Sequence, residues 1–288
     1  MNHKIFLCEN TMEGIFSGIF DAWNQAREIG HMHCRIETKV PFYHRIEDEN
    51  KTQWNLQEYE KNYELFSEYV EVEPNADHAQ RVIRTILERM GQEVYEGIYM
   101  ALSAEAEDLM QECVRNPEYD KGNSVYKLMV AGLKLKHGEQ IMDHLTNPYV
   151  ANVFKLIRRV NNEACREKQF LRFKELKNGV LFAKIGPDNN VLQMIAPHFA
   201  DRYPLENFMI YDEKRKMFVV HEQRKAWVVV QNEEVNQDMI HQFTEQEAYY
   251  EDLFRMFCKT IAIEARTNYR LQQQMCPIKF QKYMLEFD

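Results

Sequence analysis

Glycine and proline are scarce in this chain of 288 residues, which contains 10 Gly and 8 Pro. The sequence has no G-x-x-x-x-G-K-[ST] or G-x-G-x-x-G loop, no G-x-S-x-G elbow and no H-E-x-x-H motif. These absences exclude the usual phosphate-cradling loops, the serine-hydrolase elbow and the zinc-protease helix. No internal repeat or low-complexity segment occurs either.

Paired cysteines and long apolar runs are also missing. The six cysteines form no C-x-x-C pair, so neither a zinc ribbon nor a disulfide framework is expected. The run His31-Met32-His33-Cys34 offers soft ligands, but nothing nearby completes a metal site, and we expect neither metal nor cofactor. No run approaches the roughly 18 apolar residues of a membrane-spanning helix, and the opening soon becomes charged. We therefore expect a cytoplasmic protein without a membrane partner.

Charge is distributed unevenly along the chain. The whole sequence carries a formal charge of -9, but residues 151–227 contain 15 basic and 9 acidic residues. This stretch, called here the basic segment, can attract a polyanion locally because salt screens each charge beyond about 10 Å at 0.1 M. The alternative interpretation is a solvated surface that happens to be basic.

The hydrophobic pattern predicts an α+β fold with a helix-rich N-terminal half. Residues 4–8 read as a strand, and Asn10 with Glu13 as a capping box opening an amphipathic helix. Residues 34–40 and 69–73 alternate like strands on either side of a polar, exposed connection. From residue 76 to 165 the apolar spacing is helical, and Asn147-Pro148 caps a helix at 148–165.

The C-terminal half changes to a strand-like period. Residues 170–185 predict a hairpin, followed by a helix near 191–199 and three further strands, which gives an antiparallel β-β-α-β-β-β sheet. After Thr244, which should cap the N–H of Glu247, a long C-terminal helix is expected as far as Met275. We place a boundary between residues 1–146 and 147–288, or expect one compact unit bridged by the helix at 148–165.

Three side chains are candidates for acid–base chemistry. Glu163, Asp188 and His198 fall near the predicted junction of sheet and helices, where a carboxylate could orient the imidazole. A cap or turn role for Asp188 and plain surface polarity for His198 are the alternatives.

Basic and aromatic residues of the basic segment are the candidates for nucleic-acid contact. A strand through 170–173 would place Phe170 and Arg172 on one face, where the ring could stack on a base and the guanidinium could hold a phosphate. Alternatively, Arg172 pairs with Glu163 or Asp188 while the phenylalanines join the core. The full candidate set is Arg158, Arg159, Arg166, Lys168, Phe170, Arg172, Lys184, Arg202, Arg215 and Lys216.

Several stretches together resemble a bacterial family that carries the domain of unknown function numbered 4130. The resemblance runs through Asn162–Cys165, Phe170–Phe173, Ile185–Asp188, Ile195–Arg202, Met209–Asp212 with Arg215, and the tail from Ala265 to Phe280. The opening, Phe6-Leu7-Cys8 with Thr11, Glu13-Gly14-Ile15 and Phe20, is similar as well. Two positions depart from the family pattern: Cys165 stands where relatives often have His, and Gly186 where they commonly have Glu.

The resemblance implies a role in DNA metabolism or DNA repair. Members are typically encoded beside a radical-SAM protein akin to spore photoproduct lyase, and longer relatives are fused to a uracil-DNA glycosylase domain. The chain has no C-x-x-x-C-x-x-C motif for a radical-SAM cluster, so we expect any such chemistry on a partner. The leading hypothesis is a nucleic-acid-binding accessory protein. An enzyme using a Glu/Arg/Asp/His cluster and a protein-interaction scaffold are the alternatives.

Overall fold

The computed structural model describes residues 3–39, 41–48, 51–58, 64–231 and 243–287, with backbone alone for 41–48, 51–58 and Glu245. Contacts divide the chain into unit 1, Met1–Asn161, and unit 2, Asn162–Asp288. The boundary falls inside one long helix, α6 (Pro148–Phe170), the helix that we expected to bridge the two halves. The predicted boundary at 146/147 lies just before this helix starts.

Unit 1 is built around a three-stranded parallel sheet in the order β2-β1-β5. Its strands are β1 (His3–Cys8), β2 (Cys34–Thr38) and β5 (Ser67–Val72), at the predicted positions, while Val40 lies outside the described residues. Parallel neighbours need a crossover, and α1 (Met12–Ile29) supplies it between β1 and β2. An added Cβ at Gly18 would collide with Cys8 Sγ, so glycine allows α1 to approach β1 closely.

Two details of this region correct the sequence-based expectation. The cap of α1 is Thr11, which accepts a 3.0 Å hydrogen bond from Gly14 N, instead of Asn10. The stretch between β2 and β5, expected to be an exposed connection, contains the antiparallel strands β3 (Pro41–Asp48) and β4 (Lys51–Glu58). The two strands form a hairpin, and the sequence analysis did not predict it because the polar composition of this stretch suggested a loop.

From residue 76 onward the elements of unit 1 are helical, as the 3.6-residue periodicity predicted, whereas the short helix at His31–His33 was not expected. Asp120 caps the helix that follows it and also accepts hydrogen bonds from Thr38 N and Oγ1 at 3.0 and 2.7 Å, which fastens that helix to β2. The helices are η1 (His31–His33), α2 (Ala76–Arg89), α3 (Gln92–Leu102), α4 (Glu107–Arg115), η2 (Pro117–Tyr119), α5 (Lys121–Gly132) and η3 (Gly138–Asp143), followed by α6.

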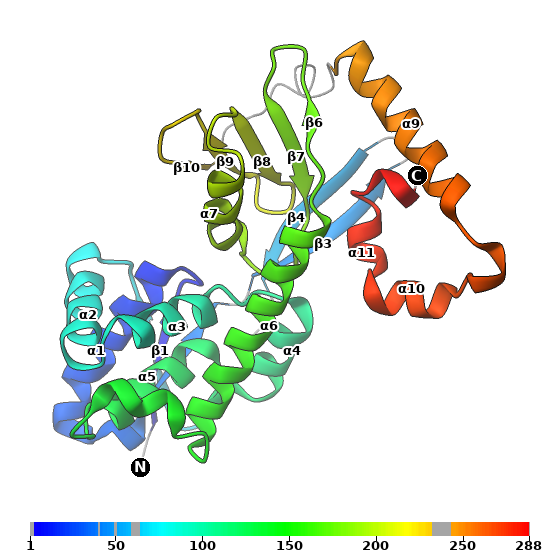
Figure 1. The fold of residues 1–288 in the computed structure, drawn as a ribbon. Helices are drawn as coiled ribbons and strands as arrows, with labels where there is room; N and C mark the ends of the chain where they lie inside the picture. Colours follow the sequence, from blue (N-terminus) through cyan, green and yellow to red (C-terminus); the bar gives the residue numbers. More distant parts are fainter. Residues whose placement is uncertain (1–2, 40, 49–50, 59–63, 232–242, 288) are drawn as a thin grey trace. The chain divides into compact units, whose positions relative to one another are not determined.

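Unit 2 contains a five-stranded sheet in the order β10-β9-β8-β7-β6, which confirms the α+β class and the predicted β-β-α-β-β-β succession. The elements are β6 (Lys174–Glu175), β7 (Leu181–Ile185), α7 (Leu192–Arg202), β8 (Phe208–Asp212), β9 (Met217–His221) and β10 (Val228–Gln231). One pairing differs from the expected antiparallel sheet: β7 and β8 are parallel, because the predicted helix between them, α7, is a crossover connection. Leu176, Phe182 and Phe218 pack together as a buried cluster of this sheet, and α7 contacts β9 (Figure 1).

Two predicted boundaries in unit 2 are wrong. Helix α6 continues to Phe170, so Phe170 and Arg172 do not alternate along one strand. The long C-terminal helix is interrupted: α9 (Glu245–Ile261) is followed by η4 (Glu264–Arg266), α10 (Tyr269–Met275), α11 (Ile278–Gln281) and η5 (Leu285–Phe287). Asn268 restarts the helix by accepting from Leu271 N, a local bond that competes with helix continuation. Thr244 caps Glu247 N at 3.0 Å, as predicted.

Candidate functional site

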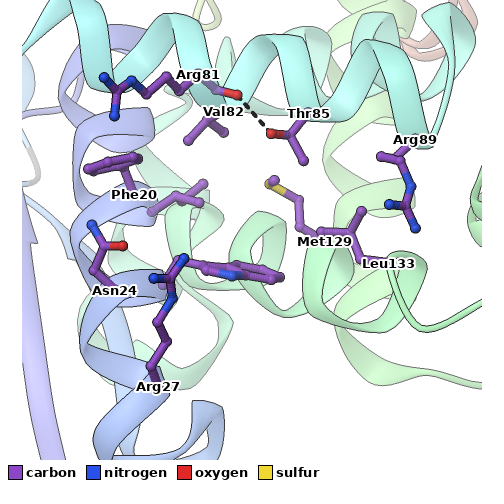
Figure 2. A pocket seen from close by; sticks show the side chains of 11 residues that line it. Phe20, Asn24, Arg27, Arg81, Val82, Thr85, Arg89, Met129 and Leu133 are labelled. Atoms are coloured by element: carbon purple, nitrogen blue, oxygen red, sulfur yellow. Dashed lines mark hydrogen bonds between the residues drawn. The ribbon is translucent and has the colours of Figure 1, made fainter.

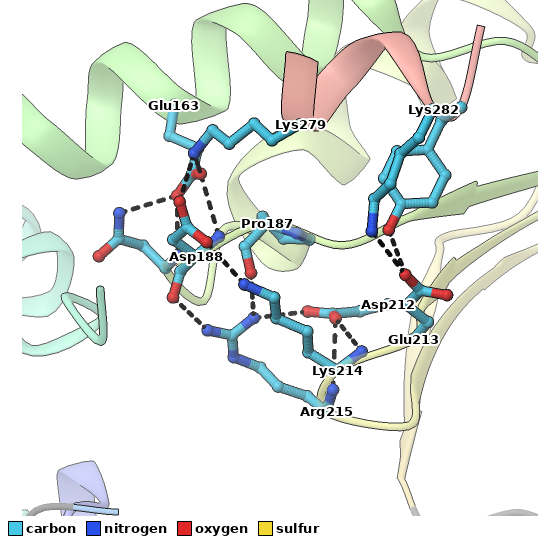
Figure 3. A network of polar contacts seen from close by, with 11 residues as sticks. Glu163, Pro187, Asp188, Asp212, Glu213, Lys214, Arg215, Lys279 and Lys282 are labelled. Carbon is cyan, nitrogen blue, oxygen red and sulfur yellow. Dashed lines mark hydrogen bonds and ion pairs between the residues drawn. The ribbon is translucent and has the colours of Figure 1, made fainter. Parts of the chain in front are cut away.

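Unit 2 holds a cluster of interacting charged and polar side chains, called here the polar network (Figure 3). Four segments contribute to it: the C-terminal part of α6, the end of β7 with the loop after it, the turn after β8, and the tail around α11. Its members are Glu163, Glu167, Lys184, Asp188, Asn189, Asp212, Glu213, Lys214, Arg215, Lys279, Lys282 and Tyr283.

Helix geometry places two acids in the interior of unit 2. Glu163 and Glu167 lie four residues apart, so they share one face of α6, and they are only 5% and 3% exposed. This face continues the apolar stripe of the same helix. A buried carboxylate is costly without compensating partners, so the rest of the site must supply them.

Glu163 binds the loop after β7. Its Oε1 accepts from Asp188 N at 3.0 Å, and its Oε2 accepts from Asn189 N and Asn189 Nδ2, both at 2.8 Å. Lys279 Nζ forms an ion pair with the same carboxylate. The loop is thus held by one side chain of α6 and closed by a lysine of the tail.

Asp188 lies between two ammonium groups. Lys214 Nζ is 2.6 Å from Oδ1 and Lys279 Nζ is 2.5 Å from Oδ2. Burial alone would raise the pKa of Asp188, but the two lysines outweigh it and lower the pKa to about 2. Burial likewise acts to lower the pKa of Lys279, whereas Glu163 and Asp188 raise it. Both partners therefore remain charged at neutral pH.

Arg215 ties the turn after β8 to the loop after β7. Its Nη1 donates to Asp212 Oδ2 at 2.9 Å and to Pro187 O at 3.1 Å, and its Nη2 donates to Asp188 O at 2.8 Å (Figure 3). Asp212 also accepts from Lys214 N at 3.0 Å, which shapes the turn. Arg215 is 8% exposed and Asp212 is fully buried, so this ion pair lies in the interior of unit 2 and stabilises its fold.

Glu213 gathers partners from the sheet and the tail. Its carboxylate pairs with Lys184 at 2.7 Å and Lys282 at 3.0 Å and accepts the hydroxyl of Tyr283. Burial would raise the pKa of Glu213, but Lys184 and Tyr283 lower it to about 2. An added Cβ at Gly186 would collide with the Tyr283 hydroxyl and lie 3.1 Å from Glu213 Oε1. Tyr283 can therefore reach Glu213 only because position 186 carries no side chain.

Glu167 is a buried acid whose pKa is raised into the neutral range. Burial and then the charge of Glu163 raise its pKa to about 8, against a smaller lowering effect from Lys279. Glu167 therefore holds a proton in the folded protein at pH 7. Buried acids with such shifted pKa values are frequent at sites of proton transfer, although structural ion-pair networks produce them too.

The chemistry open to the network follows from these pairings. Its cations are engaged by its own carboxylates, so it offers little attraction for an anion. Its most exposed side chains are Lys184, at 48%, and Asp188 and Lys279, at 39% and 38%. Among the described residues, no group of three or more His, Cys, Asp or Glu side chains is arranged to hold a metal ion.

The structure brings together two of the three predicted acid–base candidates. Glu163 and Asp188 meet through Lys279 and through the Asp188 N–H. His198 lies on the exposed side of α7, with its ring 5.1 Å from that of Phe199, and it has no contact with the network in the part of the chain that the structure describes.

Several predicted nucleic-acid contacts are already engaged within their own unit. Arg159 pairs with Asp108 and Arg172 with Glu286, instead of Glu163 or Asp188, while Phe170 packs against Phe280. Lys184 and Arg215 belong to the polar network. The predicted cations that form no ion pair with any described residue are Arg158, Arg166, Lys168, Arg202 and Lys216.

Sequence reasoning missed most of the network. Glu167, Glu213, Lys279 and Tyr283 lie far apart along the chain, and only folding joins them. One signal was available: Glu163 and Glu167 occupy positions where the apolar stripe of α6 predicts hydrophobic residues. A charge at such a position indicates a buried partner elsewhere in the protein.

Comparison of the sequence and fold with known proteins assigns the chain to a protein family. A DHH domain from a member of a family of ribosomal proteins aligns over 76% of this chain and 73% of its own, at 11% identity and a TM-score of 0.23, too low to indicate a shared fold. No curated protein matches. Residues 119–286, more than half of the chain and including the whole polar network, match the domain of unknown function DUF4130. The chain therefore belongs to the DUF4130 family.

Proposed function

We propose that this protein is an accessory factor of DNA repair or DNA metabolism that binds nucleic acid and presents it to a partner repair enzyme of the radical-SAM type. The observation that supports DNA binding is a set of four cations in unit 2 that pair with no acid in the described part of the chain, although the protein is acidic overall. They are Arg166, Lys168, Arg202 and Lys216, and all but the half-buried Lys168 are exposed. The repair role and the partner rest on the family resemblance, and we expect both to act in the cytoplasm.

Binding through these cations makes a quantitative prediction. Each duplex phosphate neutralised by a cation contributes about -0.9 to the slope of log K against log salt concentration, because counterions are released. Four such contacts give a slope of about -3.6. Fluorescence anisotropy with labelled single- and double-stranded DNA across a salt series measures the slope directly.

A matched pair of variants separates these cations from overall charge. The quadruple Arg166→Gln, Lys168→Gln, Arg202→Gln, Lys216→Gln should weaken binding and flatten the salt dependence. A control of equal charge change in unit 1, at the exposed positions Arg84, Arg115, Lys134 and Lys136, should leave both nearly unchanged. Equal losses in the two variants would refute DNA binding through these four cations.

Unit 1 contributes a smaller, separate test at α6. Arg158 and Arg159 are both exposed, but Arg159 is held by Asp108 at 2.6 Å. We expect Arg158→Gln to account for most of the effect of the Arg158→Gln, Arg159→Gln double variant on DNA affinity. Wild-type affinity in the double variant would remove α6 from the proposal.

The partner is tested apart from DNA. Co-purification of the full chain with a purified radical-SAM repair protein, with and without DNA, should give a complex. Tight partner binding with no DNA binding at low salt would favour the scaffold alternative.

A second candidate, acid–base chemistry on a nucleic acid, is supported by the raised pKa of Glu167, which interacts electrostatically with the partly exposed side chains of Asp188 and Lys279. In this case the wild-type protein converts a labelled damaged oligonucleotide, and Glu167→Gln or Asp188→Asn reduces the rate without abolishing binding. Absence of any product over a series of lesions would count against this candidate.

A further inference from the structure

Unit 1 contains a pocket that takes no part in the function proposed above. It has a volume of about 410 Å³ and lies between α1, α2 and α5 (Figure 2). This volume falls within the roughly 300–1,000 Å³ typical of small-molecule sites. The lining residues are Ile19, Phe20, Trp23, Asn24, Arg27, Arg81, Val82, Thr85, Arg89, Met129 and Leu133.

Helical spacing explains why these side chains converge. Those of α1 run from position 19 to 27 at offsets of 1, 4, 5 and 8, and those of α2 from 81 to 89 at offsets of 1, 4 and 8. Both sets therefore lie on single helix faces. Met129 of α5 and Leu133, the residue that caps the C-terminus of α5, lie one turn apart and close the third side.

The pocket has an aromatic wall in a fixed orientation. The Trp23 ring is held by edge contacts to His31 and Tyr126, with centroid distances of 4.6 and 6.2 Å. Phe20 is stacked against His78 at 4.1 Å. Both rings are half-buried, so part of each remains accessible to a ligand. Stacking of a nucleobase on such a ring contributes about 1–3 kcal/mol.

The polar lining is cationic without a carboxylate. Arg27, Arg81 and Arg89 line the pocket, and none of them forms an ion pair with a residue in the described ranges. The Arg81 guanidinium lies 5.7 Å from the Phe20 ring centroid, beside the aromatic wall. The neighbouring acid of α1, Asp21, faces His78 at 3.4 Å. Guanidinium groups bind phosphate through paired N–H donors, so these three arginines favour a phosphate-bearing ligand.

We propose that this pocket binds a nucleoside monophosphate, with the base against Trp23 and Phe20. The phosphate is held at one end of the pocket, because Arg81 and Arg89 lie two turns apart on α2 and extend toward opposite ends (Figure 2). Asn24 and Thr85 add neutral polar groups. Thr85 Oγ1 donates to Arg81 O at 2.8 Å, which leaves its lone pairs to accept from a sugar or base. The site lies outside the basic segment and uses none of the residues proposed for DNA contact.

Isothermal titration calorimetry of the full chain with AMP, GMP, CMP and UMP tests this assignment. At least one should bind saturably, and the matching nucleoside and inorganic phosphate should each bind at least tenfold more weakly, because each lacks half of the contacts. No saturable heat with any of the four at millimolar concentration would overturn the proposal. Equal affinity for nucleotide and nucleoside would overturn it as well.

Variants locate the binding. Arg81→Gln or Arg89→Gln, according to which end of the pocket holds the phosphate, should weaken binding of the best nucleotide at least tenfold, about 1.4 kcal/mol. Arg84→Gln removes an exposed arginine of the same helix that does not line the pocket, and should have no effect. Circular dichroism checks folding, and Arg27→Gln on α1 provides an independent variant. If Arg81→Gln and Arg89→Gln both bind the nucleotide as tightly as Arg84→Gln does, or if only oligonucleotides bind, the site is refuted whatever the outcome for the DNA-binding proposal.

Discussion

Glu163 offers a sharp test of how the polar network stabilises unit 2. Glu163→Ala removes an acceptor that is 5% exposed and that serves Asp188 N, Asn189 N and Asn189 Nδ2, together with the ion pair to Lys279. Lys279 is 38% exposed and keeps its ion pair with Asp188, so the loss comes mainly from the donors left without an acceptor, at about 1–3 kcal/mol for each buried one. Since domains unfold with about 5–15 kcal/mol in total, this loss should be evident.

The measurement must report on unit 2 alone, because two compact units need not unfold in one transition. Native-state hydrogen exchange provides this readout. The free energy of opening measured at the β8 amides should fall by the whole loss in stability, while the β1 amides of unit 1 serve as an internal reference. Asn162→Ala, an exposed neighbour on the same helix, should change protection by no more than about 0.5 kcal/mol. A loss below about 1 kcal/mol for Glu163→Ala would refute the reasoning.

Three further predictions concern the same unit and the cysteines. Gly186→Ala should lower the free energy of unfolding by about 1–3 kcal/mol, because the new methyl group displaces the Tyr283 hydroxyl. In a Tyr283→Phe background, which lacks this hydroxyl, the same substitution should cost less. Equal costs in the two backgrounds would argue against the contact. The pKa of Glu167, about 8 when folded and 4.5 ordinarily, means that the folded protein keeps a proton that the unfolded chain releases, so stability should fall as pH rises between these values. Glu167→Gln should flatten this slope in urea titrations, and an unchanged slope would contradict it. Thiol reagents should modify the exposed Cys165 quickly and leave Cys113, whose pKa burial raises to about 12, intact; Cys165→Ser should therefore remove the fast phase.

Local patterns were sufficient for much of the fold. The apolar spacing of α1 and the caps at Asn147 and Thr244 depend on residues within a few positions of one another, and the structure has them as predicted. Elements that depend on distant pairing were harder. The hairpin β3–β4 was concealed by its polar composition, and the parallel pairing of β7 with β8 follows from where α7 crosses, which no local pattern specifies.

The candidate site shows the same division. Glu163 and Asp188 could be singled out from the sequence, but Lys279, which joins them, is 116 residues from Glu163 and 91 from Asp188. Whether a cation is accessible also depends on contacts that the sequence does not reveal. Arg172 forms an ion pair with Glu286, 114 residues away, and Arg215 is buried against Asp212. Net charge along a segment is therefore a poor guide to which of its cations are available to a ligand.

The attachment of the tail to the polar network has a consequence for the order in which the protein is made. A ribosome synthesises Glu163, Asp188 and Glu213 long before it reaches Lys279, Lys282 and Tyr283. Until then the nascent chain has an acidic cluster that lacks its final counterions, and the sheet of unit 2 forms without its closing contacts. The segment around α11 acts as a completion step, so a premature stop codon just before Lys279 would yield a chain that has every strand of unit 2 but lacks the contacts that finish its fold.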